Sequence, residues 1–325
     1  MNYLDQTGLL PGGNRYRGNL HSHTTVSDGN WTPEEAAREY RAHGYSFLVL
    51  TDHDIYTDRT DLDTDDFILL PGVEASATLR AGRRMAKTHH LLGIGIPGAA
   101  NPFRDGERLS PPRFEGGWDG AAAAQALCDT LRARGCLVVY NHPIWSRVEE
   151  GEFIHTRGLT ALEVWNYATV SESGLGWDDA RWDVMLRAGN DLFAVATDDN
   201  HNGGTYDESF GGWITVRAAA LTREAITAAI LAGSYYSSAG PEIEAWGVRD
   251  NRVWVECSLC ERINMLAGGP IGNGRTALAP GGGALRGASF PLRGGEEYVR
   301  VECVDHRGRK AWSNPLRLRP APDGE

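Results

Sequence analysis

Lysine is nearly absent from this sequence. The chain of 325 residues has lysine only at Lys87 and Lys310, and its formal net charge is −11. A phosphate backbone is held mainly by clustered Lys and Arg, so this charge balance argues against general nucleic-acid binding. A small-molecule substrate is the expected partner.

Long apolar runs are also missing. No window approaches the roughly 18 apolar residues that a membrane-spanning helix needs, and the first residues lack an apolar stretch behind a basic start. We therefore expect a cytoplasmic protein with no membrane segment. Oligomeric state leaves no signal in the sequence.

Cysteine is scarce, with five residues in the whole chain. An odd number in a long chain argues against a disulfide framework, so we expect reduced thiols. Cys257 and Cys260 could suggest half a zinc site. On a regular strand, however, a spacing of three sends the two side chains to opposite faces, which argues against that site.

Hydrophobic residues make up 41% and charged residues 23%, values typical of a globular protein with a sizeable core. Short apolar runs alternate with amphipathic stretches between residues 16 and 231, a pattern typical of βα repeats. The expected strands are 17–21, 47–51, 67–73, 90–94, 137–141, 162–165, 193–197 and 213–216. This number is close to what an α/β barrel needs.

Capping signals mark two helices. Thr32, Pro33 and Glu35 form a capping-box start and Gly44 a stop, which predicts a helix over 33–43. A second helix should follow Thr222, and weaker patterns predict helices near 121–134 and 178–188. Beyond residue 240 alternating runs separated by glycines predict a small antiparallel β domain, so we divide the chain into 1–240 and 241–325.

Acidic and imidazole side chains gather at the ends of the expected strands. The segments that carry them are His21-Ser22-His23, Ser27-Asp28-Gly29, Thr51-Asp52-His53, Gly72-Val73-Glu74, His90-Leu91-Leu92-Gly93, Asn141-His142-Pro143 and Asp198-Asp199-Asn200-His201. A strand sends His21 and His23 to one side, so both imidazoles can bind one ion. In a parallel barrel these edges converge on one face, which predicts a shared metal site.

In their residues and their order, these segments resemble the motifs of the PHP (polymerase and histidinol phosphatase) metallohydrolases, over about residues 15–240. The resemblance implies a distorted (β/α)7 barrel, with the strand near Trp213 outside the ring. The stretch 233–241 resembles the segment leading into the β appendage of the carbaryl-hydrolase-like branch.

The resemblance also implies a ligand set. His21, His23, Glu74 and Asp199 would hold one ion, while Glu74, His90 and His142 would hold a second that shares the glutamate. Asp28, His53 and His201 would complete a third, more variable site. We favour His90 over His89 because the family's ligand directly precedes an apolar-apolar-Gly run.

Mixed imidazole and carboxylate ligands suit Mn²⁺, Fe²⁺ or Zn²⁺, and we expect two or three divalent ions. Ions about 3.5–4 Å apart would lower the pKa of a bridging water and polarise the bond under attack. We predict His53, His201 and Asp199 as catalytic residues, the two histidines as proton donors if the third site is empty. Trp145 and Arg147 are candidates for substrate contact.

Three functions stay open. The first is a phosphoesterase that uses a metal-bridging hydroxide on a small phosphorylated metabolite or nucleotide, because three carboxylates offset only part of the +6 of three divalent ions. The second is a hydrolase of uncharged ester, carbamate or amide bonds, suggested by the tail and by tryptophans near the motifs. The third is a non-catalytic metal-binding module.

Overall fold

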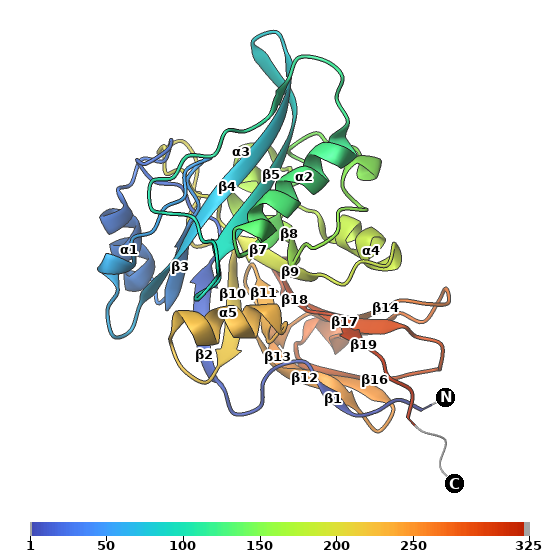
Figure 1. The fold of residues 1–325 in the computed structure, drawn as a ribbon. Helices are drawn as coiled ribbons and strands as arrows, with labels where there is room; N and C mark the ends of the chain where they lie inside the picture. The colour runs from blue at the N-terminus through green and yellow to red at the C-terminus, as the bar shows by residue number, and fades with distance from the viewer. Residues whose placement is uncertain (1, 322–325) are drawn as a thin grey trace.

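The computed structural model describes residues 2–321, which form a mixed α/β fold with a large sheet and five α-helices (Figure 1). Seven strands pair in chain order along this sheet: β2 (Asn14–Asn19), β3 (Phe47–Leu50), β4 (Ile68–Ala81), β5 (Arg84–Gly95), β7 (Cys136–Tyr140), β8 (Ala161–Asn166) and β9 (Phe193–Thr197). Among the described residues, no helix is long and apolar enough to cross a membrane.

The expected (β/α)7 barrel is met only in part. The pairings β2–β3, β3–β4, β7–β8 and β8–β9 are parallel, but β5 runs antiparallel to both β4 and β7. The two ends of the series meet just beyond β2 and β9, where Ser22 and Asn200 form an isolated parallel bridge. Within residues 2–321, no continuous ladder joins β9 to β2, so the sheet curves round without closing as a hydrogen-bonded barrel.

Four of the five helices pack against strands of this sheet. The five are α1 (Pro33–Ala42), α2 (Gly120–Ala133), α3 (Tyr167–Ser173), α4 (Asp179–Arg187) and α5 (Arg223–Leu231), with 3₁₀ turns η1 (Thr60–Leu62), η2 (Glu150–Glu152) and η3 (Pro280–Gly282). Four of the five α-helices match the expected ones. The short α3 has no amphipathic signal and begins where the Asn166 side chain accepts a hydrogen bond from the Thr169 N–H.

The capping box of α1 is formed as predicted. The Glu35 N–H donates to the Thr32 hydroxyl at 3.2 Å, and the Thr32 N–H donates to the Glu35 carboxylate at 2.9 Å. The start of α1 therefore has two of its otherwise unpaired N–H groups satisfied.

Thr32→Ala should lower the free energy of unfolding by about 1 kcal/mol, because it removes the acceptor for the first turn. Denaturant titration would measure the loss. Thr32→Ser keeps the oxygen and should recover most of the stability, and equal losses in both variants would contradict the capping role.

The C-terminal part is rich in antiparallel strands. One sheet has the order β1 (Gln6–Thr7), β12 (Ile243–Arg249), β13 (Arg252–Cys260) and β16 (Leu285–Pro291). The other strands belong to or flank the large sheet: β6 (Arg113–Phe114), β10 (Trp213–Ala218), β11 (Tyr235–Ser238), β14 (Arg262–Ala267), β15 (Arg275–Leu278), β17 (Tyr298–Val304), β18 (Lys310–Ser313) and β19 (Leu316–Arg317).

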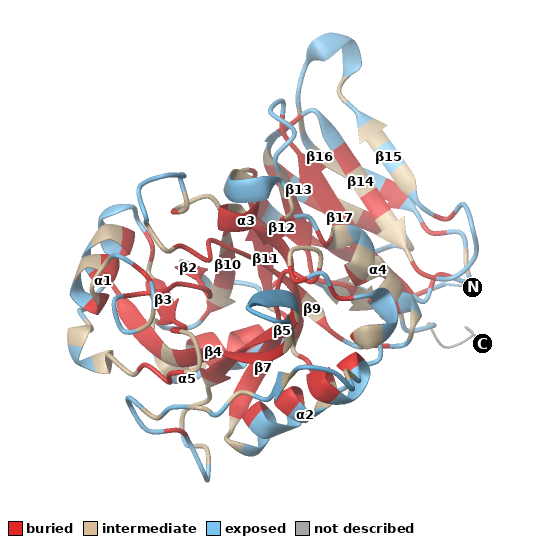
Figure 2. Cartoon of the chain, turned by 90° about the horizontal axis from the view of Figure 1, so that it is seen from above, coloured by how far each residue is buried: buried red, intermediate tan, exposed pale blue. Residues whose placement is uncertain are grey.

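The two regions are connected through hydrogen bonds. β18 pairs with β11, which pairs with β10, and β10 pairs antiparallel with β2 at one edge of the seven strands. Residues Gln6–Thr7 join the C-terminal region by pairing with β12. Buried residues concentrate in the strands of both regions (Figure 2). Every residue of β3, β7, β8 and β17 is buried, so both faces of these strands are covered. A domain boundary after residue 240 stays a prediction.

Candidate metal centre

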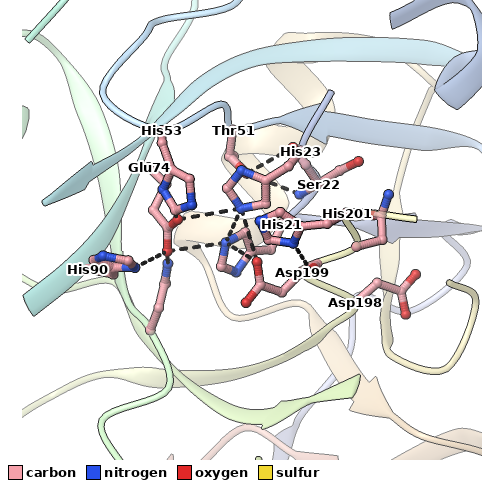
Figure 3. A network of polar contacts seen from close by, with 12 residues as sticks. His21, Ser22, His23, Thr51, His53, Glu74, His90, Asp198, Asp199 and His201 are labelled. Atoms are coloured by element: carbon pink, nitrogen blue, oxygen red, sulfur yellow. Dashed lines mark hydrogen bonds and ion pairs between the residues drawn. The ribbon is translucent and has the colours of Figure 1, made fainter. Parts of the chain in front are cut away.

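Most of the candidate side chains come from segments that directly follow a strand. His21 and His23 follow β2, His53 follows β3, His142 follows β7, and both Asp199 and His201 follow β9. Glu74 lies inside β4, which continues further than the sequence pattern predicted. The side chains meet in one group, drawn in part in Figure 3.

His90 reaches the group by a route that the sequence did not predict. It was expected to open a strand, and in a parallel barrel such a position would lie at the opposite edge from the other ligands. In the structure β5 begins at Arg84 and runs antiparallel to β4, with His90 paired to Ser76. The reversed direction returns His90 to the edge where Glu74 lies.

Glu74 is the centre of the group (Figure 3). Its Oε1 lies 3.2 Å from His21 Nε2, 3.1 Å from His90 Nδ1 and 3.3 Å from His142 Nε2. Its Oε2 lies 2.8 Å from His53 Nδ1 and 3.4 Å from His23 Nε2. One fully buried carboxylate thus contacts five histidines from four separate segments.

Asp199 shares the two histidines of the first segment with Glu74. Its Oδ1 lies 3.0 Å from the Nε2 atoms of both His21 and His23, and those two nitrogens are 3.1 Å apart. Asp199 has φ of 56°, a left-handed conformation that side chains other than glycine, Asn and Asp adopt at a cost. Asp is one of the few residues that adopt this conformation readily, so it suits a position where the turn aims a carboxylate at His21 and His23.

A more open group surrounds Asp28. Its carboxylate oxygens lie 3.5 Å from His201 Nε2, 3.7 Å from His53 Nε2 and 4.0 Å from His23 Nδ1. Asp28 is exposed, whereas His53 and His201 are partly buried. These distances are longer than those around Glu74, and a third, more variable site at Asp28, His53 and His201 stays a prediction.

Two neighbouring aspartates are not part of the group and accept hydrogen bonds from nearby loops. Asp52 accepts hydrogen bonds from the N–H and hydroxyl groups of Thr24 and Ser27. Asp198 lies apart from the group (Figure 3) and accepts hydrogen bonds from Tyr40 and from the N–H groups of Phe210, Gly211 and Gly212. Both hold the loops that carry the candidate ligands.

His89 is turned away from the group. Its ring stacks on Trp118 at 5.1 Å between centroids, and its Nδ1 is hydrogen-bonded to the Tyr140 hydroxyl. Of the two adjacent histidines, only His90 therefore contacts Glu74.

Sequence analysis missed Glu163, a buried residue of β8. Its carboxylate lies 2.8 Å from His21 Nδ1, and it accepts hydrogen bonds from the His142 N–H and the Asn166 amide. It thereby orients His21 with Nε2 toward Glu74 and Asp199. The alternation of strand 162–165 could have placed Glu163 on the inner face, but a lone acidic residue gave no reason to single it out.

Glu163→Gln should weaken metal binding by about 10- to 100-fold, because a partner that fixes a ligand histidine sets its orientation and basicity. Competition with a fluorescent chelator would measure the affinity. Glu224→Gln, an exposed change in α5, is the matched control, and unaltered affinity in Glu163→Gln would contradict this role.

The buried charges act strongly on one another. Burial alone would lower the pKa of His21, but Asp199, Glu74 and Glu163 raise it well above its usual value. Burial and the neighbouring His53 lower the pKa of His23 to about 4. Burial would raise the pKa of Asp199, but His21 and His23 hold it far below its usual range. The pKa values of His21 and His23 are thus shifted in opposite directions.

The donor set fits divalent cations. His23 Nδ1 and Glu74 Oε2 are buried without a hydrogen-bond partner, the latter despite its closeness to His53. Buried polar atoms of this kind are costly unless a ligand satisfies them. Imidazole nitrogens and carboxylate oxygens that converge on shared points are the ligands that Mn²⁺, Fe²⁺ and Zn²⁺ accept.

A cavity of about 360 Å³ opens over the group. Asp28, His53, Glu74, His90, His142, Asp199 and His201 line it together with Met85, Trp145, Ala168, Thr169, Glu172, Tyr206 and Glu208. Trp145 therefore lies where a substrate could contact it, and its indole N–H donates to Glu172. Arg147 is exposed and is absent from the lining, so the structure does not place it at the cavity.

No family model matches the chain. An alignment over 124 residues with the 5′–3′ exoribonuclease Rnm of Salmonella typhimurium is 32% identical and covers 31% of this chain. The match spans 41% of the length of that curated relative.

Solved structures that resemble this chain include PHP-like proteins. A two-domain protein of Bacteroides vulgatus, described as containing a predicted PHP-like metal-dependent phosphoesterase, has a TM-score of 0.47 and 13% identity over 94% of this chain and 95% of that one. A candidate metal-dependent phosphoesterase of Bifidobacterium adolescentis has a TM-score of 0.40 and 15% identity over 59% and 90%. An amidohydrolase of Chromobacterium violaceum has a TM-score of 0.40 and 19% identity over 58% and 89%. No carbaryl-hydrolase-like protein is among these, so the resemblance of the tail stays a prediction.

Proposed function

We propose that this chain is a metal-dependent hydrolase of the PHP kind that cleaves a phosphoester of a small metabolite or nucleotide. The observation that carries the proposal is the shared carboxylate of Glu74, whose two oxygens face different histidines. His21, His23, Glu74 and Asp199 would hold one ion, and Glu74, His90 and His142 a second. Asp28, His53 and His201 would hold a third or act without it.

Divalent cations at such a centre lower the pKa of coordinated water and polarise the bond under attack. The residues of the chain orient the reacting groups around them. Glu163 fixes His21, and the Ser146 hydroxyl lies 3.1 Å from His142 Nδ1 and fixes that ring. His53 and His201 line the cavity beside Asp28, from where either imidazole could deliver a proton to a leaving oxygen.

The cavity also limits the substrate. Within the described part of the chain, no Lys or Arg lines it, and Glu172 and Glu208 add negative charge. A single phosphate group could be neutralised by bound cations, but further phosphates would meet carboxylates. Trp145 and Tyr206 offer aromatic faces for a base or an aryl group. These features favour a substrate with one phosphate group.

The same lining supports a second candidate, the hydrolysis of an uncharged ester, carbamate or amide, because no Lys or Arg of the described residues lines the cavity to select an anion. A panel with Mn²⁺-loaded protein separates the candidates: an aryl phosphomonoester, a phosphodiester, a carboxyl ester and a short oligoribonucleotide, the last because of the exoribonuclease similarity. Phosphoester cleavage supports the first proposal. Carboxyl-ester turnover alone supports the second, and silence with all metals bound supports a non-catalytic module.

A further inference from the structure

Three of the five cysteines meet in the interior of the C-terminal region. Cys257 and Cys260 lie on β13 and Cys303 lies on β17, and their sulfur atoms are all within 4.8 Å of one another. Each is at most 3% exposed. The strands belong to different sheets, so the thiols meet between the two layers.

The spacing of Cys257 and Cys260 predicted opposite faces, and that expectation is wrong. Val253, Val255 and Cys257 are buried in regular alternation along β13. The register with β16 then shifts between Glu256 and Cys260, which breaks the alternation. The irregularity returns Cys260 to the inner face beside Cys257.

The apolar surroundings determine the charge that the three sulfur atoms can carry. The cluster lies in a core with Ile243, Val255 and Ile263, where an unpaired thiolate would be costly. A soft divalent cation would displace three thiol protons to solvent and leave a net charge of −1 shared over three sulfurs. Thiolates prefer soft ions, whereas Mn²⁺ prefers oxygen and nitrogen donors.

We propose that Cys257, Cys260 and Cys303 form a second metal site, for one soft divalent cation of the Zn²⁺ and Cd²⁺ class, separate from the histidine–carboxylate centre. Within residues 2–321, no fourth His, Cys, Asp or Glu ligand atom belongs to this group, so the three thiolates would be the protein ligands. Bound here, the ion joins the two sheets across the core and stabilises the C-terminal region. This inference does not rest on the proposed hydrolase activity.

The test uses reduced full-length protein that is first loaded with Mn²⁺ and then titrated with Cd²⁺. Cadmium bound by thiolates gives a charge-transfer absorption in the near ultraviolet that cadmium on imidazole and carboxylate does not give. We expect the band to saturate at one thiolate-bound Cd²⁺ per chain. Cys260→Ser should lose it, whereas Cys136→Ser, a change at a buried cysteine of β7, should keep it.

A measurement on the wild-type protein does not depend on the folding of a variant. X-ray absorption of the Zn²⁺-loaded chain should contain a sulfur shell at about 2.3 Å. Nitrogen and oxygen scatterers alone, or a wild-type titration without the thiolate band, would overturn the proposal. Persistence of the band in folded Cys260→Ser would overturn it too.

Discussion

Glu74→Gln should lower kcat/KM by about 10³-fold, because losing the shared carboxylate removes several kcal/mol of cation-mediated charge stabilisation. Glutamine keeps the shape of the side chain but carries no charge, so both sets of histidines that face Glu74 lose their common anionic ligand. Metal analysis after dialysis should find fewer bound ions per chain. Steady-state kinetics with added Mn²⁺ would measure the fall in turnover.

The exposed Glu224→Gln variant is the control for Glu74→Gln and should behave like the wild type. Circular dichroism would establish that both variants are folded. A folded Glu74→Gln protein with full turnover would refute the role of Glu74 as a shared ligand.

Asp199→Asn should lower kcat/KM about as much as Glu74→Gln does, and the protein should lose at least one bound ion. Asparagine tolerates the left-handed conformation at this position, so the substitution removes charge without backbone strain. The oxygen that lies 3.0 Å from both His21 and His23 would lose its negative charge. Asp199→Ala should lose metal and activity as well, with an added loss of stability from the positive φ.

Asp28→Asn should have a smaller effect on metal content and kcat than Asp199→Asn. Asp28 is exposed and lies 3.5–4.0 Å from its histidine neighbours, so its loss should affect the third ion alone and lower turnover less. Metal content and kcat measured on the two variants would show this order. An equal effect at Asp28 and Asp199 would contradict the division into two tight ligand sets and one loose set.

Much of the candidate site could be predicted because ligands at the ends of neighbouring strands converge whatever the details of the loops. His21 and His23 share a side by strand alternation, and His142 and Asp199 each follow a buried strand. The capping box at Thr32 was predictable because its signal lies within four consecutive residues. These features depend on few residues and on geometry that strands and helices always have.

The rest depended on how strands and loops pair with one another in the fold. The direction of β5 follows from its hairpin with β4, and a single apolar run at 90–94 has no preferred direction. Glu163 matters because of His21 and His142, which are far from it in the sequence and are brought to it only by the fold. The register shift in β13 moved Cys260 to the inner face, which a regular strand forbids.

Anomalous scattering from crystals grown with Mn²⁺ tests the central claim most directly. The account predicts one manganese peak among His21, His23, Glu74 and Asp199, and a second among Glu74, His90 and His142. Absence of any peak beside Glu74, with these side chains pointing into separate environments, would contradict it.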